Sequence, residues 1–197
     1  MSIPVVYEDA WFLIVDKPSG LLTIPTPKKE TRTLTSILNL HPCHRLDRET
    51  SGLIIYAKTK TAQKKMMEEF KKKKVKKNYI AFVRGSPKQE SGSINYPIEG
   101  QVAITRYKVI EKRNNFAIVK VEPLTGRTNQ IRIHFKQIGH PVLGETKYAF
   151  RRDFKVKAKR LCLHAAGLQF IHPVTGKNVA LNINLARDLE EFLKTHD

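Results

Sequence analysis

Short runs of hydrophobic residues recur along the chain, and several of them alternate with polar residues as the two faces of a strand do. The runs that predict strands lie at residues 5–7, 12–15, 21–24, 53–57, 78–83, 102–110, 116–121, 161–168 and 179–183. Polar segments rich in turn-forming residues separate them, and the longest predict loops at 25–32, 86–93 and 150–160. The pattern therefore predicts a protein with a large β-sheet.

Four other segments keep the spacing of a helix, with apolar residues three and four apart. They lie at 34–38, 61–73, 128–138 and 186–193. Thr61 and Thr128 are the expected N-caps of the second and third helices, and Gly139 is the expected end of the third. Strands outnumber helices and occur in consecutive runs, which favours an α+β fold with a mixed, mainly antiparallel sheet.

Length and composition fit one globular domain. The 197 residues contain no internal repeat, no domain-scale linker and no apolar run near the ~18 residues of a membrane span. The first residues lack a signal peptide pattern, and Cys43 and Cys162 are too few and too far apart for a disulfide framework. We expect a single domain over residues 1–197, in the cytoplasm and away from membranes, with a monomer as the default state.

Charge narrows the choice of partner. The chain carries 36 Lys and Arg against 18 Asp and Glu, a net charge of +18. Residues 58–88 hold twelve basic and two acidic residues, and residues 151–160 hold six and one, so these windows carry fifteen of the eighteen excess charges. A concentrated positive surface is typical of proteins that bind nucleic acid. General solubility is the plainer alternative, and a membrane surface fits less well because no large apolar face adjoins the basic runs.

The segment His44–Leu53 carries the most distinctive chemistry. Asp47 lies between Arg45 and Arg48, and a Thr-Ser-Gly turn signal leads into an apolar strand. An acid on a polar turn at the entrance of a strand can project into a cleft while the strand holds its backbone still. Taken alone, however, Asp47 also fits an ordinary surface ion pair with its neighbouring arginines.

Several motifs together resemble the RluA family of RNA pseudouridine synthases, over roughly residues 5–185. The two most specific are the ten-residue block at 44–53 and the motif at 124–134, which contains Thr-Gly-Arg and Gln-Ile-Arg-Ile-His. Shorter matching segments lie in the same order at 17–20, 77–81, 139–144, 163–165 and 170–173.

The resemblance implies a sheet divided by a central catalytic cleft and uridine in RNA as the substrate. The reaction breaks the C1′–N1 glycosidic bond, turns the uracil and rejoins it through C5. Asp47 corresponds to the family's catalytic aspartate, Tyr79 to the tyrosine that stacks on the target base, and Arg132 to the arginine that pairs with the aspartate. The resemblance implies no organic cofactor and no metal.

The same resemblance and the charge pattern predict how RNA is held. Ile131 is expected to pack on the other face of the base, and Gln130 to contact the substrate. Arg45 is expected either to fill the gap left by the flipped nucleotide or to pair with a phosphate. Backbone phosphates are the expected partners of a further set of cations, namely Arg127, Lys71, Lys72, Lys73 and Lys74.

Two departures from the family pattern affect these expectations. Asn129 stands where the family often has His, so its hydrogen bonding is retained in altered form. The chain also begins close to the catalytic motifs, without the S4-like RNA-binding domain of many relatives. The catalytic domain's own basic surface is then expected to grip the RNA, which in this family is ribosomal RNA, transfer RNA or both.

Two other functions compete with this interpretation. A metal-dependent hydrolase would use His41, His44 and Asp47, which are three residues apart, although Pro42 argues against a helix that would bring them together. A catalytically inactive RNA-binding protein would keep the fold, although the presence of Asp47, Tyr79 and Arg132 together argues against it. Two roles also stay open for Asp47, namely covalent attack on the sugar and abstraction of a sugar proton.

Overall fold

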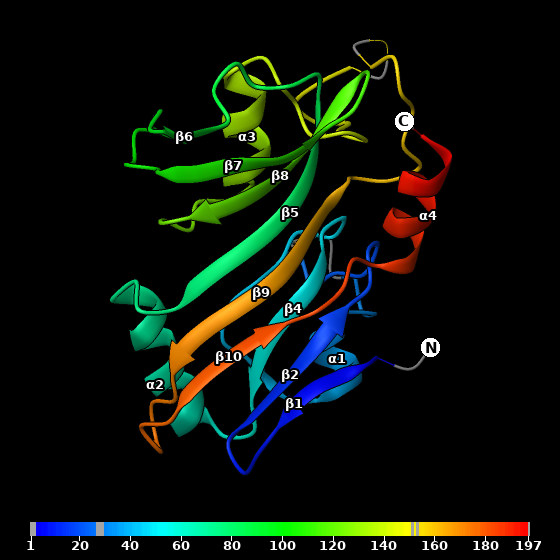
Figure 1. The fold of residues 1–197 in the computed structure, drawn as a ribbon. Coiled ribbons are helices and arrows are strands. Elements are labelled where there is room, and N and C mark those ends of the chain that lie inside the picture. Colours follow the sequence, from blue (N-terminus) through cyan, green and yellow to red (C-terminus); the bar gives the residue numbers. More distant parts are fainter. Residues whose placement is uncertain (1–2, 27–29, 151, 153, 197) are drawn as a thin grey trace. The chain divides into compact units, whose positions relative to one another are not determined.

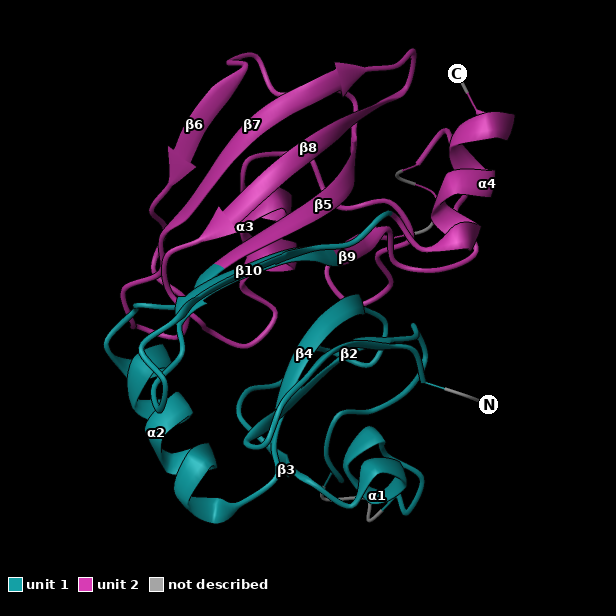
Figure 2. Cartoon of the chain, turned by 60° about the horizontal axis from the view of Figure 1, so that its bottom comes forward, with its two compact units in different colours: residues 1–76, 165–184 teal, residues 77–164, 185–197 magenta. Residues whose placement is uncertain are grey.

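A computed structural model describes residues 3–26, 30–150, 152 and 154–196. The described chain forms two compact units, which are coloured separately in Figure 2. Unit 1 comprises residues 1–76 and 165–184, and unit 2 comprises residues 77–164 and 185–197. Parts of the loops expected at 25–32 and 150–160 lie outside the described residues, namely 27–29, 151 and 153. The prediction that residues 1–197 act as one domain stays a prediction.

Unit 1 is a sheet with two helices. Its strands follow the order β1, β2, β4, β9, with β3 paired to β4 and β10 paired to β9. Their bounds are Val5–Glu8 for β1, Phe12–Lys17 for β2, His41–Pro42 for β3, Ser51–Ala57 for β4, Leu163–Ile171 for β9 and Asn178–Asn182 for β10. The helices are α1 (Leu34–Leu38) and α2 (Lys60–Lys71). The paired strands for which a register is defined run antiparallel.

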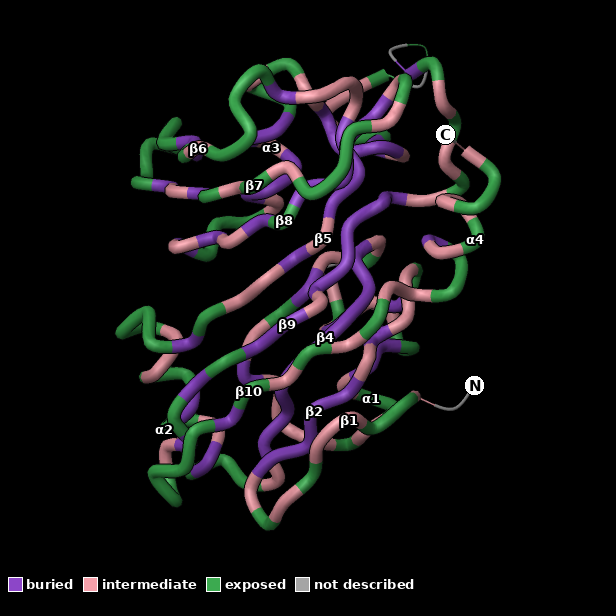
Figure 3. Tube along the Cα trace, viewed as in Figure 1, coloured by how far each residue is buried: buried purple, intermediate pink, exposed green. Residues whose placement is uncertain are grey.

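The core of unit 1 forms around β4, which is apolar from Leu53 to Ala57. All seven of its residues are buried, and the burial colours of Figure 3 show β4 as an interior strand. Side chains from β2, β4, β9 and the inner face of α2 meet in one cluster, which includes Phe12, Leu53, Ile55, Met66 and Phe170. A strand buried on both faces provides a rigid support for the segment that precedes it, and that segment contains Asp47.

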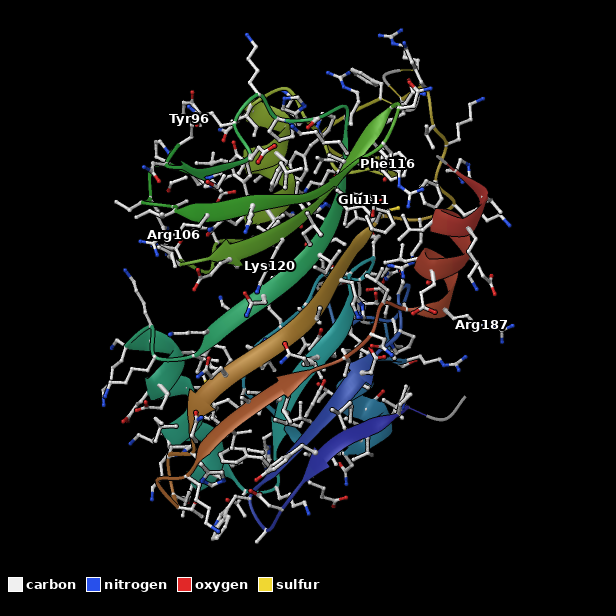
Figure 4. All side chains as sticks on the ribbon, viewed as in Figure 1. Tyr96, Arg106, Glu111, Phe116, Lys120 and Arg187 are labelled. Carbon is white, nitrogen blue, oxygen red and sulfur yellow. The ribbon has the colours of Figure 1, made fainter. Side chains whose placement is uncertain are left out.

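Unit 2 is a four-stranded sheet in the order β5, β8, β7, β6, and its registered pairs are antiparallel. The strands are β5 (Lys76–Arg84), β6 (Ser91–Ile94), β7 (Thr105–Lys112) and β8 (Phe116–Pro123). Helix α3 (Gln130–Gln137) lies across one face of this sheet (Figure 1). Helix α4 (Arg187–Thr195) packs Phe192 against Phe82 and against Phe116, which is labelled in Figure 4.

The expected fold class, an α+β protein with a mainly antiparallel sheet, is confirmed. The expected strand at 21–24 is wrong, because only Leu22 makes an isolated bridge, to Thr33. Two strands were not expected: β3 at His41–Pro42, and β6, which begins at Ser91 inside a predicted loop. Both contain mostly polar or turn-forming residues, so their strand conformation depends on pairing with a neighbouring strand.

The expected end of α3 at Gly139 is confirmed, since Gly139 follows the C-cap Ile138 with a φ of +82°, but the two expected N-caps are wrong. The side chain of Thr59, not Thr61, accepts the capping hydrogen bond of α2, from the backbone N–H of Ala62. The residue that precedes α3 is Asn129, not Thr128, and it has a φ of 54°. Asparagine adopts this left-handed conformation more readily than most residues, which explains the displaced start.

Gly52, in β4, is required by its surroundings. Its φ is +114°, and a Cβ atom there would lie 2.4 Å from the backbone oxygen of Ala165 in β9. Gly20 has a φ of +86° with nothing within 4 Å of the same position. A substitution at Gly20 would therefore introduce backbone strain alone, whereas a substitution at Gly52 would introduce both strain and steric overlap.

We expect Gly52→Ala to lower the free energy of unfolding by about 3 kcal/mol or more, because strain and overlap add together. Gly20→Ala, with strain alone, is expected to cost about 1 kcal/mol. Urea unfolding of both variants beside the wild type measures the difference. Equal losses would contradict the steric role of Gly52.

Asp9 joins two turns of unit 1. Its carboxylate accepts hydrogen bonds from the hydroxyl of Tyr7 (2.7 Å), from the backbone N–H groups of Trp11 and Phe12 (both 2.7 Å) and from Nε2 of His172 (2.9 Å). Burial raises the pKa of Asp9, but the hydrogen bonds from Tyr7 and the two backbone amides lower it, and so does His172. The net result is a pKa below the usual value.

Because Asp9 has a lower pKa in the folded than in the unfolded chain, it stabilises the protein above its ordinary pKa of 3.8. That contribution is lost as the pH falls from there through the lowered pKa. Asp9→Asn should therefore flatten the acid limb of a plot of Tm against pH. An acid limb identical to that of the wild type would contradict this role.

Candidate active site

Asp47 lies on a tight turn immediately before β4. The backbone N–H of Thr50 donates to the carbonyl of Asp47 (3.2 Å), which closes the turn. Leu46 and Thr50 are buried, whereas Asp47 is partly exposed. A turn is therefore present, but it precedes the expected Thr-Ser-Gly signal, because β4 begins at Ser51, two residues earlier than expected. Asp47 is thus partly exposed between the buried Leu46 and the exposed Arg48.

Side chains from the segment after β2 hold the backbone of this turn. Oγ1 of Thr23 accepts from the N–H of Leu46 (3.2 Å) and donates to the Leu46 carbonyl (2.9 Å). The hydroxyl of Ser19 donates to the carbonyl of Glu49 (2.6 Å). The turn is thus fixed on both sides of Asp47 by hydrogen bonds that do not use its carboxylate.

Lys17, the last residue of β2, adds a charged anchor. Its side chain is 0% exposed, and its ammonium donates to the carbonyls of Pro18 (2.9 Å), Leu21 (2.8 Å) and Arg48 (3.1 Å). Three carbonyl oxygens replace the water that a buried ammonium loses. The sequence motif contained Lys17 but did not indicate this role. A signal was present, since Lys17 keeps the strand phase of the buried Leu13 and Val15.

The arginines beside Asp47 have different surroundings. Arg48 pairs with Glu30, also in unit 1. Arg45 is exposed, on the chain that leads into the turn. The alternative of a simple surface ion pair between Asp47 and Arg48 is weakened because Arg48 has this other carboxylate. The expected contact of Arg45 with RNA stays a prediction.

Tyr79 lies on β5 in unit 2, opposite Val121 of β8, and is 9% exposed. Lys77, two residues earlier, shares its face of the strand, and burial lowers the pKa of its ammonium. A Cβ on Gly126 would lie 3.8 Å from Nζ of Lys77, so the Thr-Gly-Arg motif passes close to this lysine. Tyr79 is thus held on a central strand with a cation two residues before it on the same face.

Gln130 ties the motif at 124–134 together. Its carbonyl oxygen accepts from the hydroxyl of Thr125 (2.7 Å) and the N–H of Arg127 (3.0 Å), and its amide donates to the carbonyl of Ile104 (3.0 Å) and Oγ1 of Thr105 (2.9 Å). These bonds support the loop that carries the exposed Arg127. Ile131 is buried at the start of α3. Contacts of Gln130, Ile131 and Arg127 with RNA stay predictions.

Arg132 lies on α3 and is buried, 5% exposed. Its Nε and Nη2 each donate to one carboxylate oxygen of Glu145, both at 2.7 Å. The side chain of Glu145 is 0% exposed. The sequence analysis did not identify Glu145. It lies thirteen residues after Arg132, and the motif at 139–144 that precedes it does not indicate a partner for an arginine. A buried arginine needs a carboxylate, but the sequence does not say which one.

Backbone groups also hold Glu145. Its Oε1 accepts from the N–H groups of Thr146 (2.9 Å), Lys147 (2.7 Å) and Tyr148 (3.2 Å). Burial raises the pKa of Glu145, but the hydrogen bonds and charge of Arg132 and the amides of Lys147 and Tyr148 lower it by more, so the net pKa lies below its usual value. Glu145 is therefore a fixed anion next to Arg132.

Asn129 completes the surroundings of Arg132. Its Oδ1 accepts from Nη1 of Arg132 (3.2 Å), and its Nδ2 donates to the hydroxyl of Tyr148 (2.8 Å). The guanidinium carbon also lies 5.5 Å from the centre of the Tyr148 ring. The position that departs from the family pattern thus takes part in the hydrogen bonding around Arg132.

Lys71, Lys72, Lys73 and Lys74 lie at the C-terminal end of α2, where all four are exposed. Cations at this end of a helix are favoured by the helix dipole even without a ligand. Their only recorded ion pair within the described chain is a long one, 4.0 Å between Lys72 and Glu69. The group is therefore accessible to phosphates.

The residues of the competing metal hypothesis have other roles. Nε2 of His44 accepts from the backbone N–H of Ile55 (3.1 Å), and its ring packs against Phe70. Among the described residues, no three His, Cys, Asp or Glu side chains are arranged to hold a metal ion. In the same part of the chain, every helix is too short or too polar to cross a membrane.

The expected catalytic and substrate-binding residues divide between the two units. Asp47 and Arg45 belong to unit 1, and Tyr79, Arg127, Gln130, Ile131 and Arg132 belong to unit 2. Within unit 2 the structure joins Arg132 to Glu145, Asn129 and Tyr148. The pairing of Asp47 with Arg132 stays a prediction.

Comparison with known proteins identifies the family. Residues 11–137 match a family model described as RNA pseudouridylate synthase. A relative from Haemophilus influenzae, named dual-specificity RNA pseudouridine synthase RluA, is 34% identical over 91% of this chain and 92% of its own length. The protein of the same name from Escherichia coli K12 is 35% identical over 89% of this chain and 90% of its own.

Solved structures agree on the fold. The human RNA pseudouridylate synthase domain containing 4 has a TM-score of 0.84 at 24% identity, covering 97% of this chain and 92% of that chain. The human RNA pseudouridylate synthase domain containing 1 has a TM-score of 0.78 at 25% identity, covering 98% of this chain and 94% of that chain. The family model and the curated relatives show that the chain belongs to the RluA family of RNA pseudouridine synthases and is an enzyme of that class.

Proposed function

We propose that this enzyme isomerises uridine in stem-loops of ribosomal or transfer RNA, with Asp47 as its essential catalytic carboxylate. The observation that carries the proposal is the position of Asp47, partly exposed on a turn whose backbone is held by Thr23, Ser19 and Lys17. A carboxylate that acts on a bound substrate has to be accessible while its backbone stays fixed. Family membership supplies the reaction to which this position is suited.

The chemistry requires an ionised carboxylate. Cleavage of the C1′–N1 bond develops positive charge on the sugar, and a carboxylate can stabilise that charge, attack C1′ or remove a sugar proton. In each route Asp47 must be charged in a site from which water is largely excluded, so it needs a cation close to it. Arg132 is the proposed cation, and its buried guanidinium is already oriented within unit 2.

Tyr79 is proposed to stack on the target uracil after the nucleotide leaves its helix. An aromatic ring offers any base a flat apolar face, and base–aromatic stacking is worth about 1–3 kcal/mol. Burial on central strand β5 limits the motion of the ring. Ile131 is proposed to close the other face of the base, and Arg45 to occupy the gap in the helix or to pair with a phosphate.

Backbone phosphates are the proposed partners of Arg127 and of the exposed lysines at 71–74. Such contacts give affinity and salt dependence but little sequence information. The named relatives from Haemophilus influenzae and Escherichia coli are described as dual-specificity enzymes, which supports a substrate range of more than one RNA. We propose that this chain also acts on more than one stem-loop.

We expect Asp47→Asn to lower turnover by at least about 10³-fold, because the amide can neither attack nor take a proton. Binding of RNA should stay within about twofold. Rejoining uracil through C5 releases the C5 hydrogen, so tritium release from RNA labelled at C5 of uridine measures turnover. Glu49→Gln, in the same turn, is the matched control. Near-normal tritium release by Asp47→Asn would contradict a catalytic role for Asp47. If the wild type released no tritium from any cellular RNA, the alternative of a catalytically inactive RNA-binding protein would be supported instead.

Replacing Lys71, Lys72, Lys73 and Lys74 by Gln should weaken RNA binding and flatten the plot of log affinity against log salt. Each lost phosphate contact lowers the slope by about 0.7–0.9. Single-turnover chemistry at saturating RNA should change less than twofold, since phosphate contacts position rather than react. Lys108, Lys120, Lys177 and Lys194, which are also exposed, provide a control with the same change in charge. Equal slopes in the two variants would place the RNA elsewhere.

A further inference from the structure

Arg132 and Glu145 form an ion pair that is costly to build. Both side chains are at least nine-tenths buried, and both oxygens of Glu145 accept from the same guanidinium at 2.7 Å. Removing two charges from water costs about as much as their attraction returns, so apolar residues often stabilise such a site equally well. The pair is therefore better explained by the geometry that it imposes than by added stability.

The backbone that precedes Glu145 is constrained by close packing at Gly144. Gly144 has a φ of +76°, and a Cβ atom there would lie 1.9 Å from the backbone oxygen of Arg160. The turn after Gly144 then directs three N–H groups at Oε1 of Glu145. Close packing of one backbone segment on another thus determines where the Glu145 carboxylate lies.

The guanidinium is held on several sides as a result. Glu145 engages Nε and Nη2, Asn129 engages Nη1, and the ring of Tyr148 lies beside the guanidinium carbon. A guanidinium carries five N–H donors, and these bonds use three of them. The other two can serve a second acceptor, whose position is then dictated by the first.

We infer that Glu145 is a positioning residue for the reaction, which aims the guanidinium of Arg132 at the catalytic carboxylate. This inference rests on the proposed function, in which Arg132 acts on Asp47. Glu145 touches neither RNA nor the reacting atoms in this scheme, and acts only through Arg132. Because Glu145 already balances the charge of Arg132, the contribution of Arg132 to Asp47 depends on the direction of its hydrogen bonds, and hence on Glu145.

The test is a double-mutant cycle on the full chain, with tritium release from C5-labelled total cellular RNA as the readout. Glu145→Gln should lower kcat about 10- to 100-fold, the range typical of residues that orient another residue of the site without contacting the substrate. KM and RNA affinity should stay within about twofold. Glu145→Asp, which keeps the charge, should recover part of the loss.

The same substitution in an Arg132→Lys background decides between positioning and plain structural support. Lysine cannot make the two-point contact with Glu145. If Glu145 acts only through Arg132, its substitution should therefore have little further effect on the rate in this background. In that background Glu145→Gln should then lower kcat less than twofold. Asp188→Asn breaks the other two-point pair of unit 2, with Arg160 at 2.6 and 2.7 Å, and should leave kcat unchanged.

Rates are taken per molecule that binds RNA, so unfolded protein does not enter them. A Glu145→Gln variant with wild-type kcat would overturn the inference. So would an equal loss from Glu145→Gln in both backgrounds, which would make Glu145 a structural residue only. The proposed function fails separately, through an active Asp47→Asn variant, so the two failures are distinguishable.

Discussion

The buried ammonium of Lys17 is the interaction on which the arrangement around Asp47 depends. It joins the end of β2, the segment that follows and the carbonyl next to Asp47 through three hydrogen bonds. Without it, three carbonyl oxygens in a dry environment would lose a charged donor at once, at a cost of about 1–3 kcal/mol or more for each such group. The turn that carries Asp47 is therefore held by a buried positive charge, while Arg45 and the lysines at 71–74 are exposed.

The two units show the same principle in different chemistry. In unit 1, a buried cation fixes the backbone that carries a partly exposed acid. In unit 2, a buried acid fixes a cation on α3. Asp47 and Arg132 thus each have a second, buried charge nearby, which holds the backbone around Asp47 and the side chain of Arg132. Preorganisation of this kind lets the site act without rearranging its own dipoles.

Strands and the Asp47 turn were predictable because their signals are local. Leu53–Ala57 is apolar throughout, and the alternation at 116–121 marks a buried central strand. Strand β6 was not predictable, since Ser91, Gly92 and Ser93 have no strand preference and adopt the strand conformation only by pairing with β7. The α3 boundary was missed because Asn129 adopts a left-handed conformation that its neighbours do not signal. Lys17 and Glu145 were missed for a further reason. Their partners are carbonyls and a guanidinium brought close by the fold, and no spacing along the chain encodes that closeness.

Gly52 and Gly144 have a consequence for redesign of the enzyme. Each is a position where any side chain would collide with backbone, and each lies within five residues of a charged group of the proposed site, Asp47 or Glu145. Random mutagenesis aimed at new RNA targets will therefore lose most variants at these two glycines, whatever the target. The surface at 71–74 has no such steric limit, because its four side chains are exposed. Side chains at 71–74 can thus change during evolution without meeting backbone, whereas positions 52 and 144, each beside a charged group of the proposed site, accept no side chain.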